Sequence, residues 1–387
     1  MKGAAMKRFA IALAVMLAVS VPACLWDYDT LSMEAKGMPE AVDVIVGRFE
    51  RNPPLYYEMR LDRVSKDLAT HPDRLLLYDD AAVACDRLGR GDEGMDWLEK
   101  KHKVLKTLDP DGTRKDDWYR YFANVGTLRV HRWAGNGMKQ EDIAELEQAI
   151  EEIEAAIEIN PDAHFGREWV QLGLMKVMLA SGTGTEEQVS AILDEVIEGR
   201  ERTDLVEGLV GLVALGNAWE SPDVFALLSS GQFTLRDQSI AYIALQRSKE
   251  LSNEGRASLL SDKFKEEYLF FSGDRASGQT TESLDKAYGV LRENAEEFHR
   301  NRTEFMLARL ESGRHPDTDT DFWTGYVETP RADVRKFEPL IPRKTWQSPF
   351  FVFGTMALVL IGLPLVIFFV GRGVYRRARA AKLPPAV

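Results

Sequence analysis

The spacing of apolar residues along the chain predicts helices, and prolines mark where some of them stop. Ala149, Ile153 and Ala156 recur at intervals of four and three residues, which places them on one face of a helix. Pro161 cannot continue that helix, because its ring removes a backbone donor and restricts the residue before it. A new apolar pattern begins at Trp169. The chain is therefore predicted to fold back here as two antiparallel helices.

A common pattern recurs three times between residues 78 and 173. Each copy has an aromatic residue, then a small or apolar residue three places later, and a small residue directly after it. The aromatic side chain is expected to fill the gap between the two helices of a pair, and the small residue to allow their close approach. The copies are Tyr78, Ala81 and Ala82, then Phe122, Val125 and Gly126, and then Trp169, Leu172 and Gly173.

The third copy begins the pattern W-x2-L-G, and residues 40–200 resemble the tetratricopeptide repeat. The resemblance implies an all-α fold, a right-handed α-solenoid of helical hairpins, over residues 25–200. Lys176 stands where the family pattern has Tyr, and Lys101 where it has Ala. The loops near residues 109 and 135 are also longer than the family's turns, so a generic helical bundle stays open as the alternative.

Amphipathic patterns continue through residues 201–312, where the repeat motif fades. These residues are predicted to form degenerate helical repeats that cap the solenoid. A long alternating pattern with hairpin turns, which would indicate strands, does not occur in the sequence. The whole region between the two apolar ends is therefore expected to be helical.

The resemblance also implies a groove that binds a protein or peptide partner. The first helix of each pair would line this groove, and its non-packing positions are the candidate contacts. The alternative for each side chain is simple exposure to solvent. The candidates are Asp79, Asp86 and Arg87 in the first pair, Arg120, Thr127 and His131 in the second, and Arg167 in the third, with Val83, Val170 and Leu174 among them.

Two apolar runs frame the chain. Residues 1–24 begin with cations, continue with an apolar stretch and end with small residues, which predicts a signal peptide or an N-terminal anchor. Cys24 is a candidate for lipidation. Pro22 departs from the lipoprotein pattern, so simple cleavage and an uncleaved anchor both stay open.

The second run, residues 349–371, carries no charge and is long enough to cross a bilayer as a helix. A buried core helix is the alternative. Residues 313–348 are predicted to form an irregular juxtamembrane stalk, and the basic tail at 372–387 is expected in the cytoplasm. If the signal exports the chain beyond it, the protein lies in the membrane with its main domain outside the cytoplasm.

The net charge argues against a nucleic-acid-binding protein, and the cysteine content argues against a disulfide-rich fold. The net charge is -12, and removing the eight cations that flank the apolar runs leaves about -20 for the middle of the chain. Such an acidic surface repels phosphate backbones, so no nucleic-acid partner is expected. Two cysteines, Cys24 and Cys85, are too few for a disulfide framework.

Candidate chemistry in the sequence is sparse. Six histidines are scattered without HExxH, and neither a phosphate-binding loop nor a nucleophile elbow occurs, so no enzyme activity, cofactor or resident metal is expected. Asp317, Asp319, Asp321 and Glu328 have the spacing of a calcium loop. Phe322 occupies the place of the turn glycine, so a solvated acidic linker is the favoured interpretation.

Together these patterns predict a non-enzymatic, membrane-anchored extracytoplasmic scaffold that binds a protein or peptide partner through a repeat groove. A structural envelope protein that self-associates is the first alternative. An enzyme that uses a helical pocket is the second.

Overall fold

The computed structural model describes residues 25–36, 39–161, 167–183, 186–198, 202–216, 218–234, 238–256, 258, 260 and 281–333. All of these residues belong to one compact unit, Met1–Phe337. Within them the chain forms α-helices and two short 3-10 helices, and the described ranges contain no strand. The prediction of an all-α protein is confirmed.

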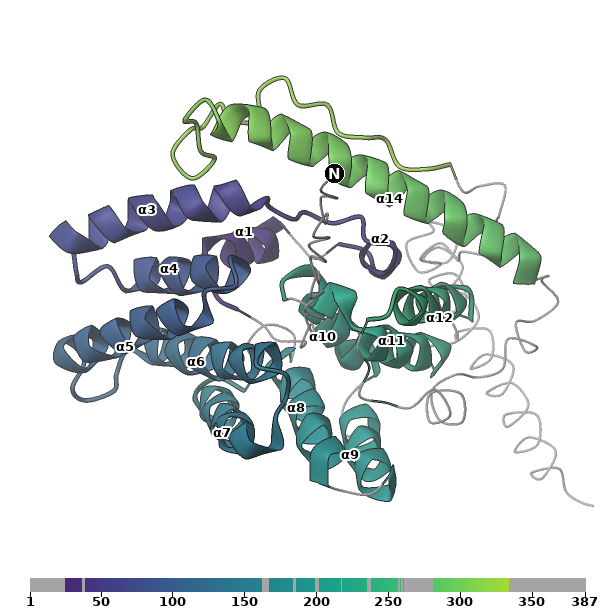
Figure 1. The fold of residues 1–387 in the computed structure, drawn as a ribbon, viewed down its shortest axis with the longest axis horizontal. Coiled ribbons are helices and arrows are strands. Elements are labelled where there is room, and N and C mark those ends of the chain that lie inside the picture. The colour runs from purple at the N-terminus through teal and green to yellow at the C-terminus, as the bar shows by residue number, and fades with distance from the viewer. Residues whose placement is uncertain are drawn as a thin grey trace, which may run out of the picture. The chain divides into compact units, whose positions relative to one another are not determined.

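Thirteen α-helices lie in the described part of the chain, and most pack against their neighbours in sequence (Figure 1). The 3-10 helices are η1 (Gln140–Asp142) and η3 (Ala218–Glu220). The α-helices are α1 (Tyr28–Lys36), α2 (Ala41–Val46), α3 (Pro54–Thr70), α4 (Leu75–Arg87), α5 (Gly91–Leu108), α6 (Lys115–Gly135), α7 (Ile143–Ile159), α8 (Arg167–Thr183), α9 (Glu186–Glu198), α10 (Arg202–Ala214), α11 (Pro222–Thr234), α12 (Gln238–Asn253) and α14 (Thr281–Leu310).

Short turns join α3 to α4 and α4 to α5. The turn between α4 and α5 contains Gly89, whose φ of 71° is a left-handed conformation that glycine adopts without steric cost. Helix α7 ends at Ile159, directly before Asn160 and Pro161, where the sequence predicted a fold-back. One hydrophobic cluster joins α6, α7 and α8, and a second joins α3, α4 and α5.

The aromatic residues of the three-fold pattern differ in burial. Tyr78 is buried beside Trp97, and Phe122 is half-buried and stacks on Trp118. Trp169 is 38% exposed. The small and apolar residues of the same pattern, namely Ala82, Gly126, Leu172 and Gly173, are all buried.

Gly126 shows how closely α6 and α7 approach each other. A Cβ at this position would lie 2.9 Å from the carbonyl oxygen of Ala149 and 2.9 Å from the Cδ1 of Ile153, both on α7. Real Cβ contacts are almost never this short, and packed interiors adapt only partly to added atoms. Because there is no room for a Cβ at this position, glycine is needed for α6 and α7 to lie this close together.

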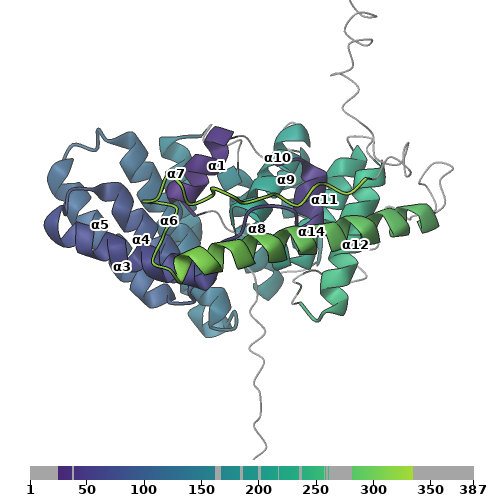
Figure 2. The same cartoon turned by 90° about the horizontal axis from the view of Figure 1, so that it is seen from above.

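The last described helix returns to the beginning of the chain. Helix α14 contacts α2, α3 and α12, and α2 also contacts α10 and α12. The segment after α14 runs back alongside that helix, as Figures 1 and 2 show. Within this segment Phe322 is fully buried with Tyr56 of α3 and Met306 of α14. Residues near both ends of the described chain thus share one core.

None of the described helices combines the length and apolar character needed to cross a bilayer. The predicted signal at residues 1–24, with Cys24, and the predicted span at residues 349–371 lie outside the described residues. The same is true of the basic tail and of the predicted stalk beyond residue 333.

Candidate functional site

The face formed by α4 and α6 holds a non-helical segment of the same chain, residues 25–27. Leu25 packs against Val83 and Leu128, and Trp26 packs against Tyr119 and Ala123. Both Leu25 and Trp26 are only 1% exposed. The helices that were predicted to line a groove for a partner therefore contact the protein's own N-terminal segment.

Asn124 of α6 binds the backbone of that segment from two sides. Its Oδ1 accepts a hydrogen bond from the Trp26 amide at 2.6 Å, and its Nδ2 donates to the Trp26 carbonyl at 3.1 Å. Asp80 of α4 accepts a further hydrogen bond from the Tyr28 amide at 2.9 Å. These contacts involve main-chain atoms, so they recognise a peptide backbone rather than one particular side chain.

Three of the candidate groove residues are buried beneath the segment. Asp79 accepts from the Lys101 Nζ at 2.6 and 2.7 Å, and both side chains are at most 1% exposed. Thr127 accepts from Gln171 at 2.9 Å. Arg167 is 2% exposed, with its guanidinium 5.3 Å from the centre of the Trp26 ring.

The other four candidates lie nearer the surface. His131 is 2.8 Å from Asp86, which ties α6 to α4. Arg87 donates to the carbonyls of Leu215 and Gly216 at the end of α10, at 2.7 and 3.2 Å. Arg120 lies 3.7 Å from Asp117 on the same helix. Contacts within the chain engage all seven candidates on α4, α6 and α8.

Arg60 of α3 is the centre of a buried ionic network that no local pattern in the sequence indicates. Its side chain is fully buried and lies 3.2 Å from Asp27, 2.8 Å from Asp29 and 2.7 Å from Asp317. Tyr56 donates to Asp29 at 2.7 Å. A buried cation requires such partners, because desolvation is costly unless charges and hydrogen bonds compensate it.

The network shifts the acidity of its carboxyl groups. Burial and the neighbouring charge of Asp29 raise the pKa of Asp27 to about 6. Burial raises the pKa of the adjacent Asp80 to about 7. The pKa of Asp317 is lowered by its hydrogen bond and ion pair with Arg60, although burial acts in the opposite direction.

Asp317 is therefore engaged by arginine rather than arranged with the other carboxylates of the calcium-like pattern. It also contacts Arg63, and Asp319 contacts Arg314. Glu328 lies 3.0 Å from Arg48. No group of three or more potential metal ligands occurs in the part of the chain that the structure describes.

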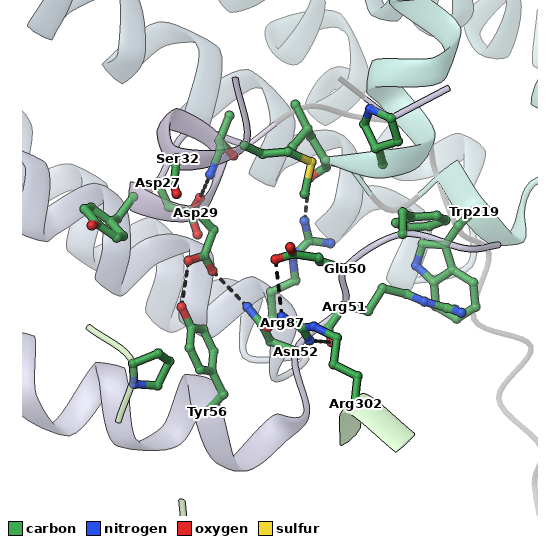
Figure 3. A pocket seen from close by; sticks show the side chains of 18 of the residues that line it. Asp27, Asp29, Ser32, Glu50, Arg51, Asn52, Tyr56, Arg87, Trp219 and Arg302 are labelled. Carbon is green, nitrogen blue, oxygen red and sulfur yellow. Dashed lines mark hydrogen bonds and ion pairs between the residues drawn. The ribbon is translucent and has the colours of Figure 1, made fainter. Parts of the chain in front are cut away.

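A cavity of about 650 Å³ opens beside this network. Figure 3 shows Asp29, Glu50, Arg51, Arg302 and Trp219 around it. The lining residues come from α1, the loop before α3, η3, α14 and the segment after α14. Charged and aromatic side chains from distant parts of the sequence thus meet at this cavity.

A smaller cavity of about 290 Å³ shares Arg51 and Trp219 with the first. Arg247 of α12, Arg292 and His299 of α14 also line it. Burial and the positive charge of Arg51 lower the pKa of His299 to about 3, so its ring is neutral near pH 7. Sequence reasoning missed both cavities, because their residues are separated by more than a hundred positions.

Neither a protein-family model, nor a curated protein, nor a solved structure matches this chain. A function for it is therefore inferred from the contacts, charges and cavities of the chain itself.

Proposed function

We propose that this protein is a non-enzymatic scaffold built from tetratricopeptide-like hairpins that form a right-handed solenoid. It is held in a membrane by residues 349–371, with its helical part outside the cytoplasm, and it binds a peptide segment of a partner protein. The repeated aromatic and small residues, the packing of successive helices and the two apolar ends of the sequence support this proposal.

The two-sided contact of Asn124 with the Trp26 peptide unit carries the proposal. A helical face that binds non-helical backbone through an amide has the chemistry needed for peptide recognition. Here that face is filled by the chain itself, and Leu25 and Trp26 are too deeply buried for easy displacement. The partner segment therefore binds beside the occupied face, in the 650 Å³ cavity that Asp27, Tyr28 and Asp29 also line.

Two carboxylates at this cavity are available to a partner. Glu50 is 50% exposed in its contact with Arg302, and Glu328 is 66% exposed in its contact with Arg48. The arginine of each pair is buried and keeps its carboxylate in place, while the exposed side of that carboxylate can accept hydrogen bonds from a bound peptide. A polar segment with cationic side chains matches this rim.

The experiment is affinity capture of the full-length chain from membranes, with chemical crosslinking. The double variant E50K/E328K places positive charge on the cavity rim, and we expect it to lose a partner that the unaltered protein retains. The matched control is E99K, because Glu99 is similarly exposed and pairs only with Lys103 on α5. Circular dichroism of both variants verifies their folding. An unchanged set of partners in the double variant would contradict the proposed site.

A further inference from the structure

Three arginines from distant parts of the chain converge on the 290 Å³ cavity. Arg51 comes from the loop before α3, Arg247 from α12 and Arg292 from α14. Phe225 and Trp219 supply apolar walls. A cavity of this size lies at the small end of the range for ligand sites, so it suits a small solute or one group of a larger molecule.

Arg51 has no carboxylate partner within 4.0 Å among the residues that the structure describes. Its Nε donates to the Nε2 of His299, which accepts because that ring is neutral. Its guanidinium lies 4.6 Å from the centre of the Trp219 ring and 5.2 Å from that of Phe49. The N–H groups of its two Nη atoms are thus left without an acceptor in the described part of the chain.

Arg247 and Arg292 depend on the same carboxylate. Glu250 lies 3.0 Å from the Nη1 of Arg247 and 3.1 Å from the Nη2 of Arg292. Arg247 is 7% exposed, and its buried Nη1 has no acceptor in hydrogen-bond geometry within the described residues. Glu250 therefore contacts two guanidinium groups, and Arg292 has a second carboxylate partner in Glu296, 3.1 Å away.

Four arginines and three glutamates line the cavity, and Glu250 beside them makes the opposite charges equal in number. Glu220 lies 2.8 Å from Arg256, Glu296 lies 3.1 Å from Arg292, and Glu254 is exposed at the rim. Burial, together with the charges of Arg247 and Arg292, lowers the pKa of Arg51 to about 10. Among these four arginines, Arg51 is the one without a carboxylate within 4.0 Å in the described part of the chain.

Gly47 allows two of the guanidinium groups to reach one point. Its φ is 88°, and a Cβ there would lie 3.2 Å from the Nη1 of Arg292 and 3.9 Å from the Nη2 of Arg51. Arg292 is fixed in this position by donating to the Val46 carbonyl at 2.7 Å. The absence of a side chain at Gly47 therefore lets the guanidinium groups of Arg51 and Arg292 lie next to the same backbone position.

We propose that this cavity binds a phosphate group, held by the guanidinium groups of Arg51, Arg247 and Arg292. Charge-assisted hydrogen bonds to an oxyanion would satisfy the open donors of Arg51 and the buried Nη1 of Arg247, and would place a negative charge beside the half-buried Arg51. A phosphate group offers oxygens in several directions, which suits three converging forks better than the two coplanar oxygens of a carboxylate. This site shares Arg51 and Trp219 with the larger cavity, but it makes no use of Glu50 or Glu328, on which the test of the scaffold function rests.

The test is isothermal titration calorimetry of the full-length chain in detergent and phosphate-free buffer, with inorganic phosphate and, separately, succinate. Phosphate is expected to bind, and R51Q is expected to weaken its Kd at least tenfold. The matched control is R74Q, because Arg74 is an exposed arginine 3.8 Å from Asp67 and does not line this cavity. Its Kd is expected to equal that of the unaltered protein.

Thermal unfolding separates binding from a purely structural role for Arg51. Without anion, R51Q is expected to melt at the same temperature as the unaltered protein or higher, because a half-buried charge without a carboxylate partner has been removed. Phosphate should raise the melting temperature of the unaltered protein and not that of R51Q. Absence of phosphate binding, binding that survives R51Q, or tighter binding of succinate would each overturn the proposal. Partner capture through the larger cavity would be unaffected by any of these results.

Discussion

The region around Asn124 and the region around Arg51 both bring polar groups inside the protein, and they satisfy them differently. Asn124 makes hydrogen bonds to Trp26 on both sides of one residue and to Asp79 beside it. The side chain of Arg51 has one hydrogen bond within the described residues, to His299, and two aromatic neighbours. In the first region, the polar groups are hydrogen-bonded to one another, as in an ordinary protein interior. The second has donors that remain open.

This difference has an energetic meaning. An internal hydrogen bond adds about 1 kcal/mol to stability, whereas a buried group left without a partner costs about 1–3 kcal/mol. Groups in the first region are therefore expected to stabilise the fold when intact and to destabilise it strongly when one partner is removed. Arg51 in the second region is expected to behave in the opposite way. Its removal should not lower the stability of the fold, and binding of an anion beside it should raise that stability.

The largest expected effect is that of R60M. The substitution leaves Asp27, Asp29 and Asp317 without their common cation, and removal of one member of a buried ionic network costs about 3–5 kcal/mol. Urea unfolding measures the loss. The control is K66M on the same helix, where the exposed pair with Asp62 contributes at most about 1 kcal/mol. A loss below about 1 kcal/mol in R60M would show that the network is not structural.

The second-largest expected effect is the pH dependence of the stability that arises from Asp80. Its pKa of about 7 lies above the unfolded value of 3.8, so the folded protein holds this proton more tightly and the group's contribution to stability falls as pH rises from about 4 to 7. D80N mimics the protonated form. It should match the unaltered protein at pH 4 and exceed its stability by about 2–4 kcal/mol at pH 8.

Denaturant unfolding at both pH values provides this measurement. D62N is the control, because Asp62 is exposed on α3 and its pair with Lys66 is solvated. It should change little at either pH. Equal stabilities of D80N and the unaltered protein at pH 8 would mean that Asp80 is not held in a costly environment.

The third effect is that of N124A, which removes the contacts to the Trp26 backbone. The expected loss is about 1–3 kcal/mol, since the amide and carbonyl of Trp26 stay buried without partners. Hydrogen exchange should accelerate in residues 25–30 more than in α9. N253A, at the exposed end of α12, should leave this exchange pattern unchanged. Uniform acceleration along the chain would indicate that the segment and the helices open together.

The smallest effects compare two glycines inside helices. G126A forces a Cβ against the backbone of α7 and is expected to cost about 1–3 kcal/mol through overpacking. At Gly289, on the exposed side of α14, a Cβ would meet nothing within 4 Å. G289A should therefore add about 0.5–1 kcal/mol through helix propensity. Calorimetric melting temperatures that shift in the same direction would contradict this difference in packing.

Local patterns were sufficient to predict the helices but not what they contact. Ala149, Ile153 and Ala156 share one buried face of α7, as their spacing predicted, because helical periodicity is a property of neighbouring residues. Asp79, Thr127 and Arg167 lie on the inner side of their helices. The segment that covers part of this side comes from residues 25–27, and nothing in the local pattern of α4 or α6 indicates that partner.

The two cavities and the ionic network around Arg60 could not be predicted from the sequence for the same reason. Asp317 resembled part of an acidic linker, since its pairing with Arg60 spans 257 positions. Arg51 occupies an irregular loop and carries no periodic signal. A charged residue in an irregular segment has the same local pattern whether it is solvated or held in a buried pair. Only the tertiary fold distinguishes these cases.

The pairing of Arg60 with Asp317 also sets an order of events during synthesis. At about 5–20 residues per second, the ribosome needs roughly 13–50 s to travel from one residue to the other. Until then the cation on α3 and the acids at Asp27 and Asp29 lack their third partner, and α2 and α3 lack the helix that covers them. The early hairpins can form as they emerge, but completion of the native core must wait for nearly the whole described chain.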